Sequence, residues 1–167
     1  MVVVMPAYNG SRTIERTLQE IPPGIADAII LVDDASQDNS VEVARALSLE
    51  VHCHPRNRGY GGCQKTCYRA ALEAGADIVV MLHPDAQYDG SRLPDMVAPL
   101  ARGQAQWSLG SRFALAGGPL KGGMPRYKYL ANRALTTVEN WVLGWQLSEC
   151  HTGYRAYSRR LLEKVDF

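Results

Sequence analysis

Short, unbroken runs of apolar residues recur in the first half of the chain, at positions 2–4, 28–32 and 78–82. These runs are rich in β-branched side chains and do not alternate with polar ones. Strands that are covered on both faces have this pattern, because neither face meets water. The runs therefore predict three parallel strands in the interior of a sheet.

Helical patterns separate these runs. Apolar residues spaced three or four positions apart follow Ser11 and Asp38, and positions 60–74 form a third helical pattern. Strands that alternate with helices through right-handed crossovers build an open α/β sheet. We therefore expect a Rossmann-like, mostly parallel sheet flanked by helices on both faces, which binds its ligands beyond the carboxyl ends of the strands.

The second half of the chain has a different pattern. A strand is predicted near positions 107–110, followed by a loop rich in glycine and proline at 116–125 and by a long helix. One side of this helix carries apolar residues: Leu130, Ala134, Val138, Trp141 and Trp145. We expect this stripe to face the core; the alternative is that its tryptophans and the neighbouring basic residues rest on a bilayer.

Composition and charge narrow the class of protein. The 167 residues, 46% of them hydrophobic, suffice for one core, and no linker or repeat divides them, so we expect a single domain over 1–167. The chain begins within a predicted strand and ends within a predicted helix, so we expect it to be part of a longer protein. Its formal net charge of +1 argues against a nucleic-acid partner.

Cysteine usage and hydropathy indicate a compartment. The four cysteines occur in an ordinary globular composition without a secretory leader, which favours reduced thiols. No apolar run approaches the roughly 18 residues of a membrane span. We therefore expect a cytoplasmic protein that is soluble or rests on the inner face of a membrane.

Polar side chains lie where the predicted strands end. Tyr8 follows the first strand, Asp33 and Asp34 follow the second, and residues 83–88 follow the third. The two aspartates are suited to a ribose hydroxyl or a base N–H. The alternative is a helix N-terminus, for which Asp38 is the better cap because it lies further from the strand.

The loop 83–88 carries the most specific chemistry. Asp85 and Gln87 alternate in an extended segment, so their oxygens are expected on the same side, where they can hold a divalent cation together with phosphate oxygens. Such a cation stabilises a departing diphosphate. The alternative is an Asp-centred turn after Pro84.

Glycine-rich and basic segments complete the candidate site. The glycines of 57–62 permit either a close approach of the backbone to a ligand or a tight turn. Arg112 is expected at a strand end, and four basic residues lie near glycine-rich loops, although surface charge is their ordinary role: Lys121, Arg126, Lys128 and Arg155. The segment 148–155 concentrates ionisable side chains, which form either a site or a hydrogen-bonded turn.

Six segments, taken in order, resemble those of glycosyltransferase family 2: residues 5–9, 32–36, 57–62, the Asp85 loop, 110–113 and 152–155. The resemblance is strongest to polyprenyl-phosphate sugar transferases, such as the dolichyl-phosphate mannose and glucose synthases, and covers residues 3–158. It implies a GT-A fold, a nucleoside-diphosphate sugar donor, a Mg²⁺ or Mn²⁺ ion and inversion at the anomeric carbon.

The resemblance also implies roles for individual residues. The nucleoside-diphosphate sugar would meet seven of them: Pro6, Ala7, Tyr8, Val32, Asp33, Asp34 and Pro84. Asp85 and Gln87 would serve the metal, and Arg112 would steady the diphosphate. His83 stands where the family usually has the first carboxylate of Asp-x-Asp, and as a metal ligand it would suit Mn²⁺ better than Mg²⁺.

Glu149 stands where relatives often carry an aspartate, which makes it the candidate general base. A hydroxyl acceptor must lose a proton during attack, whereas a lipid monophosphate, with a second pKa near about 6, is already anionic at neutral pH. A phosphate acceptor would instead need cations: Lys121, Arg126, Lys128 and Arg155. Glu149 would then orient Arg155 or His151.

Three accounts of function follow. In the first, the protein moves a hexose from a nucleoside-diphosphate sugar to a polyprenyl phosphate at the cytoplasmic face of a membrane. In the second, the acceptor is a hydroxyl of a glycan or a protein. In the third, the domain binds a sugar nucleotide without turning it over, because His83 replaces a carboxylate. The sequence does not distinguish UDP from GDP, one hexose from another, or the oligomeric states.

Overall fold

The computed structural model describes residues 1–114, 119 and 124–167. The chain folds into two compact units. The first comprises Met1–Ser108 and Tyr154–Phe167, and the second comprises Leu109–Gly153. Lys121, one of the predicted acceptor-binding residues, lies outside the described residues.

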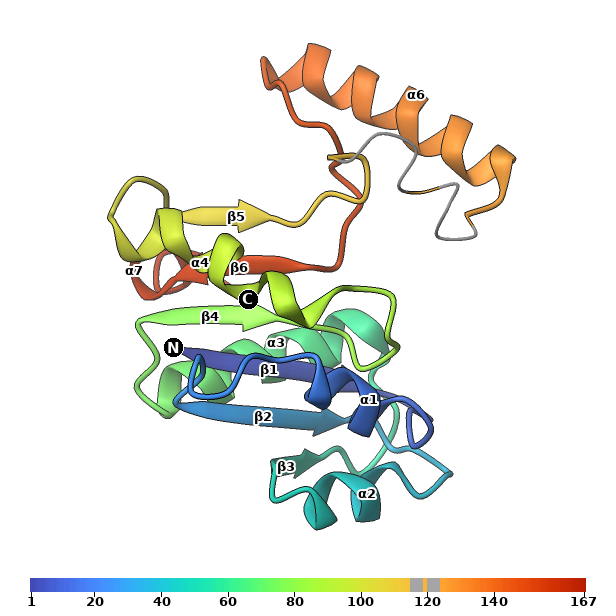
Figure 1. Cartoon of the computed structure of the whole chain (residues 1–167), viewed down its shortest axis with the longest axis vertical. Coiled ribbons are helices and arrows are strands. Elements are labelled where there is room, and N and C mark those ends of the chain that lie inside the picture. The colour runs from blue at the N-terminus through green and yellow to red at the C-terminus, as the bar shows by residue number, and fades with distance from the viewer. Residues whose placement is uncertain (115–118, 120–123) are drawn as a thin grey trace. The chain divides into compact units, whose positions relative to one another are not determined.

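The first unit is built on a six-stranded sheet with the order β3-β2-β1-β4-β6-β5 (Figure 1). The strands are β1 (Val2–Ala7), β2 (Ala28–Asp33), β3 (Glu50–Cys53), β4 (Ile78–Met81), β5 (Trp107–Leu109) and β6 (Arg155–Ser158). β1 pairs in parallel with β2 and β4, β2 pairs in parallel with β3, and β6 pairs antiparallel with β4. The predicted, mostly parallel sheet is confirmed.

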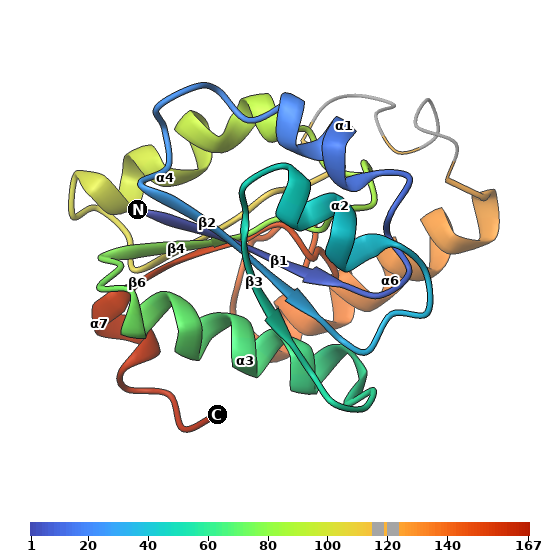
Figure 2. The same ribbon diagram turned by 90° about the horizontal axis from the view of Figure 1, so that it is seen from below.

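Helices cover both faces of this sheet. They are α1 (Ile14–Gln19), α2 (Ser40–Ala46), α3 (Gly59–Glu73), α4 (Leu93–Ala101), which follows the 3₁₀ turn Gly90–Arg92, and α7 (Arg159–Leu162). Figure 2 shows α1, α2 and α4 on one face of the sheet and α3 and α7 on the other. The expected arrangement of helices on both faces is therefore confirmed for the first unit.

Alternate residues of the central strand β1 supply the two cores. Val3 and Met5 pack with the α1, α2 and α4 side, whereas Val2 and Val4 pack with the α3 and α7 side. All four are buried, and each such side chain contributes about 1.5–3 kcal/mol when it is fully buried. Burial on both sides explains why residues 2–4 do not alternate with polar ones. It also fixes the position of the carboxyl end of β1.

The second unit is dominated by helix α6 (Arg126–Leu143) and the segment 144–153 that follows it. Gly144 ends the helix in the left-handed conformation, with φ 67°, which glycine adopts without steric cost. Asn140 then bridges the turn: its Nδ2 donates to Leu147 O (2.8 Å), and its Oδ1 accepts from Leu147 N (3.0 Å). Polar groups therefore attach this segment to α6.

The expectation that the apolar stripe of α6 faces a core is wrong. Leu130 is 67% exposed, Val138 58% and Trp141 84%. The polar side of the helix is the one that packs, because Asn132, Thr136 and Asn140 hydrogen-bond to segment 144–153. Among the helices of the described ranges, none has both the length and the apolar character needed to cross a bilayer.

Candidate functional site

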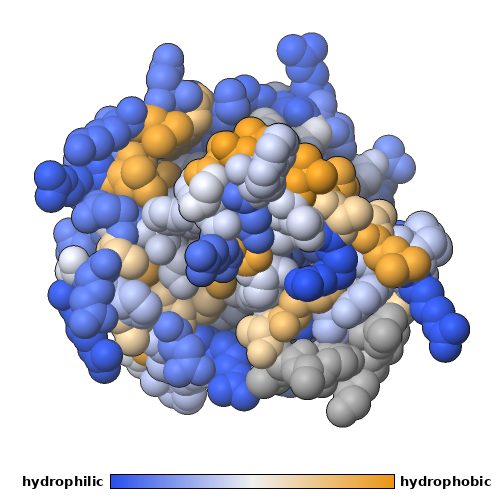
Figure 3. All heavy atoms as spheres, turned by 90° about the horizontal axis from the view of Figure 1, so that it is seen from above, coloured by the Kyte–Doolittle hydropathy of each residue, from blue (hydrophilic) through white to orange (hydrophobic). Residues whose placement is uncertain are grey.

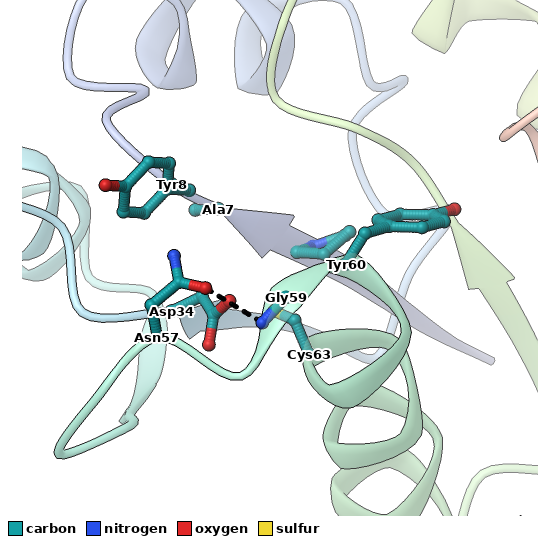
Figure 4. Close-up of a pocket in the computed structure, with 8 residues that line it drawn as sticks. Ala7, Tyr8, Asp34, Asn57, Gly59, Tyr60 and Cys63 are labelled. Atoms are coloured by element: carbon teal, nitrogen blue, oxygen red, sulfur yellow. Dashed lines mark hydrogen bonds between the residues drawn. The ribbon is translucent and has the colours of Figure 1, made fainter.

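A pocket of about 220 Å³ opens where β1 and β2 end and α3 begins (Figure 4). Eight residues line it: Pro6, Ala7, Tyr8, Asp34, Asn57, Gly59, Tyr60 and Cys63. Four of them, Pro6, Ala7, Tyr8 and Asp34, are predicted nucleoside contacts from two separate strand ends. The glycine-rich segment 57–62 supplies the opposite wall, so the structure brings these three sequence segments together.

Asp34 is fixed by its neighbours from two directions. Its backbone N–H donates to Ala7 O (2.8 Å), which joins the ends of β2 and β1. Its Oδ1 contacts His54 Nδ1 (2.6 Å) and accepts from the backbone N–H of Arg58 (2.8 Å). The carboxylate therefore holds the loop between β3 and α3 against the pocket.

His54 contacts the pocket residue Asp34 and is not among the predicted site residues. Its Nε2 lies 2.9 Å from Thr66 Oγ1 on α3, so the ring connects Asp34 to that helix. Its side chain is only 7% exposed. The available signal is its place directly after β3, since parallel strands end at the same edge of a sheet.

The environment of Asp34 favours its charged form. Burial raises the pKa of this carboxyl, but the contact with His54 and the backbone N–H groups of Arg58 and Gly59 outweigh burial, so the pKa lies below the usual value. The pocket therefore contains a carboxylate at neutral pH, and this carboxylate accepts hydrogen bonds from a hydroxyl or an N–H.

Val32, Asp33 and Pro84 are not among the lining residues of this pocket. Val32 is fully buried in the sheet, and its carbonyl accepts from Cys63 Sγ (3.3 Å). Asp33 Oδ2 accepts from Ser36 N (2.9 Å), whereas its buried Oδ1 has no hydrogen-bond partner among the described residues. A buried carboxylate oxygen is costly to leave unsatisfied, so Asp33 is suited to a donor group that the bound ligand supplies.

The loop after β4 is a turn, and the expected extended segment at 85–87 is wrong. Ala86 has a φ of 55°, and Asp85 Oδ1 accepts from Gln87 N (3.0 Å). This Asp-centred turn reverses the chain, so alternation along a strand no longer fixes where the two side chains lie. Both Asp85 and Gln87 are nevertheless exposed at the carboxyl end of β4.

His83 lies in an aromatic environment beside the pocket. Its Nε2 lies 3.0 Å from the hydroxyl of Tyr60, and its ring packs against Tyr60 and Tyr88. Burial lowers the pKa of the imidazole, nearby Asp85 raises it, and Arg155 lowers it again, with a net lowering. His83 is therefore neutral at neutral pH, and Arg155 on β6 contributes its positive charge to the same region.

The donor groups of this loop fit a divalent ion that is shared with phosphates. Within the described part of the chain, no three His, Cys, Asp or Glu side chains converge as a closed metal site. Mg²⁺ in nucleotide sites needs one or two carboxylates, because phosphates and water complete its shell. Asp85 supplies one exposed carboxylate, and Gln87 and His83 are the further candidate ligands.

Arg112 and Glu149 form the centre of the second unit. Glu149 is 1% exposed, and its Oε2 accepts from Arg112 N (2.8 Å) while its Oε1 accepts from Arg112 Nε (3.0 Å) and from Asn132 Nδ2 (3.2 Å). Arg112 Nη2 also donates to Glu149 Oε1 and to His151 O (3.2 Å). Glu149 therefore orients Arg112, a partner that differs from the expected Arg155 or His151.

The predicted basic cluster is not contained in one unit. Arg126 and Lys128 are exposed in the first turn of α6, in the second unit. Arg155 belongs to β6 in the first unit, where its pKa is raised by Tyr157, Tyr60 and Tyr68 against the effect of burial. The structure thus associates Arg155 with the pocket unit, and it associates Arg126 with the Arg112 and Glu149 unit.

We expect protonation of Asp38 to lower the stability of the folded state in acid. Burial raises the pKa of its carboxyl, but hydrogen bonds from Ser40 and Ser11 lower the pKa by more than burial raises it. The net effect is a pKa lowered from 3.8 to about 2. The folded state therefore binds this proton less readily than the unfolded chain. The stabilisation is complete above about pH 4 and disappears as the pH falls through about 2.

We expect Asp38→Asn to lower the thermal midpoint at pH 6 and to approach the wild-type midpoint near pH 2. Thermal unfolding of both proteins across this range measures the effect. Asp166→Asn, at an exposed position near the end of the chain, serves as the control for loss of one carboxylate. A constant difference between Asp38→Asn and wild type at every pH would contradict the assignment.

Comparison with known proteins identifies the fold and the family of the chain. The mostly parallel sheet, with a pocket beyond β1 and β2, is matched by solved glycosyltransferases of the GT-A fold. The chain belongs to glycosyl transferase family 2, because the sequence profile of this family matches residues 2–166. The expected fold and family are both confirmed.

Two relatives are named for transfer of a sugar to a lipid phosphate. The chain is 26% identical to the UDP-N-acetylglucosamine–dolichyl-phosphate N-acetylglucosaminyltransferase of Methanococcus voltae, over 96% of this chain and 70% of the relative. It is 27% identical to the undecaprenyl-phosphate mannosyltransferase of Micrococcus luteus, over 99% of this chain and 69% of the relative.

A solved structure resembles the chain with a TM-score of 0.72 and 27% identity: glucosyl-3-phosphoglycerate synthase of Mycobacterium tuberculosis in complex with Mn²⁺, UDP-glucose and glycerol 3-phosphate. The match covers 96% of this chain and 57% of that one. The chain thus spans little more than half the length of this structural relative.

Proposed function

We propose that the chain is the catalytic domain of an inverting hexosyltransferase that moves a hexose from a nucleoside-diphosphate sugar to a polyprenyl phosphate. The observation that carries this proposal is the pocket lined by Pro6, Ala7, Tyr8 and Asp34 at the strand ends of a family 2 chain. The names of the two lipid-phosphate relatives support the choice of acceptor.

The pocket is assigned to the nucleoside of the donor. Its volume of about 220 Å³ is below the roughly 300–1,000 Å³ of pockets that enclose a drug-sized ligand. It therefore takes one part of the donor, and the diphosphate and sugar extend beyond it. Tyr8 offers a half-exposed ring for stacking, while the Asp34 carboxylate accepts from the ribose or the base.

Asp85, Gln87 and His83 are assigned to a Mg²⁺ or Mn²⁺ ion at the diphosphate. Such an ion neutralises the charge that develops on the leaving diphosphate. Mn²⁺ in the UDP-glucose complex of the mycobacterial relative supports this assignment. A neutral imidazole at His83 suits Mn²⁺ better than Mg²⁺.

The acceptor needs positioning and no deprotonation. A phosphate monoester has a second pKa near about 6, so its oxygen is anionic at pH 7 and attacks the anomeric carbon directly. The new C–O bond forms on one side of the carbon as the bond to the diphosphate breaks on the other, which inverts the configuration. Arg112 is the residue proposed to steady the phosphates, and Arg155, which belongs to the unit that carries the pocket, is the proposed contact of the acceptor phosphate.

The acceptor places the reaction at a membrane. A polyprenyl phosphate is held in a bilayer by its hydrocarbon chain. In this proposal the nucleotide sugar comes from the cytoplasm, so the reaction takes place at the cytoplasmic face of the membrane. Product analysis with a polyprenyl phosphate and with a glycan acceptor tests the assignment. Transfer to the lipid phosphate alone supports it; transfer to the glycan alone, or donor binding without any transfer, overturns it in favour of the hydroxyl-acceptor or the inactive-domain account.

We expect the ring of Tyr8 to contribute to the affinity for the donor. Tyr8→Ala should weaken binding of the nucleoside diphosphate about tenfold, since loss of a stacked aromatic ring costs about 1–3 kcal/mol per base. Its side chain is 52% exposed, so we expect the fold to survive. Calorimetric titration with UDP and with GDP measures the change. Tyr127→Ala, which removes an exposed tyrosine of α6, is the matched control, and equal affinities for both variants would refute the role of Tyr8.

A further inference from the structure

Helix α6 exposes the side that its sequence makes apolar. Leu130, Ala134, Val138 and Trp141 are spaced three or four residues apart, so they share one side of the helix, here named the α6 apolar face. All four are exposed, with Trp141 at 84%. Figure 3, which views the molecule from above relative to Figure 1, shows hydrophobic residues interspersed with strongly hydrophilic ones on that side of the molecule.

The other side of α6 is used within its own unit. Asn132, Thr136 and Asn140 make the hydrogen bonds to segment 144–153, so the helix is held by its polar side. A surface helix of a globular domain normally does the reverse and buries its apolar side. Among the described residues of the second unit, none covers the apolar face, and an exposed apolar surface of this kind is typical of an interaction site.

The charges along α6 identify the chemistry of that partner. Three basic residues are exposed on the helix: Arg126, Lys128 and Arg133. Its one acidic residue, Glu139, lies 3.3 Å from His151 Nε2 and is directed into its own unit. The exposed charges of α6 are therefore all positive, and they border aromatic and aliphatic side chains.

We propose that the α6 apolar face docks on an anionic lipid bilayer. A helix with exposed Trp, Leu and Val on one face and cations beside it lies in the plane of a membrane interface. Each Lys or Arg near an anionic surface strengthens the attraction by about 1 kcal/mol, which is about fivefold in affinity. The helix lies on the bilayer and does not cross it, in accord with its hydropathy.

A second copy of the chain fits this face less well. The same face of another copy presents the same cations, and its only helix carboxylate is engaged by His151. An anionic surface supplies the missing negative charge across the whole face. The inference deepens the proposed function and rests on it for its purpose, because a docked domain meets an acceptor that is held in the membrane.

Vesicle flotation of the 167-residue chain tests the proposal. The chain is mixed with vesicles of phosphatidylcholine alone or with added phosphatidylglycerol, and the bound fraction is measured against lipid concentration. We expect binding to the anionic vesicles that weakens in high salt, because the Debye length falls from about 10 Å at 0.1 M to about 3 Å at 1 M. The tryptophan emission of the chain, to which Trp141 contributes, should shift to shorter wavelength on binding.

Val138→Gln combined with Trp141→Gln should lower the affinity for anionic vesicles at least tenfold. Val165→Gln, at a 50% exposed valine of the first unit, is the matched control and should bind like wild type. Equal vesicle binding by the double variant, no binding by wild type, or a dimer that the double variant abolishes would each overturn the proposal.

Donor titration on the same proteins separates this proposal from the proposed function. The double variant is expected to bind the nucleoside diphosphate like wild type, because the pocket lies in the first unit. Vesicle binding without donor binding in wild type would contradict the proposed function and leave the docking surface supported.

Discussion

Asp85→Asn is expected to lower kcat/KM for sugar transfer by about 100- to 1,000-fold, the usual effect of removing one preorganised group that stabilises transition-state charge. The loop itself should survive the substitution. Asp85 is exposed, and its Oδ1 accepts from Gln87 N, a bond that the amide oxygen of Asn also accepts. The variant therefore removes the negative charge that attracts the divalent ion and keeps the turn.

The affinity for a nucleoside diphosphate, measured with and without Mn²⁺, isolates this effect. In wild type, Mn²⁺ should strengthen binding at least tenfold, and in Asp85→Asn it should have little effect. Asp89→Asn is the matched control, since Asp89 is exposed in the same loop and accepts from Ser91 N (3.0 Å). An unchanged gain from Mn²⁺ in the folded Asp85→Asn protein would rule out Asp85 as a metal ligand.

Arg112→Ala should lower kcat by about 1,000-fold, and Glu149→Gln by about tenfold. Arg112 is the group assigned to the phosphates, whereas Glu149 acts through Arg112 by accepting its backbone and guanidinium N–H groups. Gln keeps one acceptor oxygen but loses the charge. We expect Glu149→Gln to lower the free energy of unfolding by about 1–3 kcal/mol, because a buried partner of a charged group is then poorly satisfied.

A double-mutant cycle distinguishes positioning from base catalysis. If Glu149 acts through Arg112, the double variant loses no more activity than Arg112→Ala alone, because coupled residues are not additive. The pH–rate profile of Glu149→Gln should then keep its shape. Glu163→Gln, which removes a surface partner of Arg159, controls for the loss of an ion pair. Additive losses, or a profile that loses its acidic limb, would identify Glu149 as the base.

The interior strands could be predicted from the sequence because they are covered on both sides. The runs at β1, β2 and β4 are apolar without alternation, since helices pack on both faces of the sheet. β3 is partly exposed and mixes Glu50 and His52 with apolar residues, and β6 includes Arg155 and Ser158. Neither strand carries the unbroken pattern, so neither was predictable in this way.

The site was predictable where it depends on strand ends. Tyr8 and Asp34 meet in the pocket because parallel strands end at one edge. The contact of Asp34 with His54 and that of Arg112 with Glu149 join residues 20 and 37 positions apart, and no local pattern encodes such pairs. The turn at Asp85 depends on the left-handed conformation of Ala86. The alternation of side chains expected for an extended segment does not apply to such a turn.

The pattern of α6 was read correctly as amphipathic and wrongly as core-facing. Periodicity shows that apolar side chains share one side of a helix, but it does not show what covers that side. Here Asn132 and Asn140 satisfy polar groups of segment 144–153, so hydrogen bonding decides which side of the helix packs.

The anomeric configuration of the product tests the central claim most directly. The natural protein is incubated with an α-linked nucleoside-diphosphate hexose, Mn²⁺ and a short polyprenyl phosphate, and the lipid-linked sugar is examined by proton NMR. We predict a single β-linked hexosyl phosphate, formed by direct attack of the phosphate oxygen on the anomeric carbon. An α-linked product, or free hexose without any lipid-linked sugar, would contradict inverting transfer to a polyprenyl phosphate.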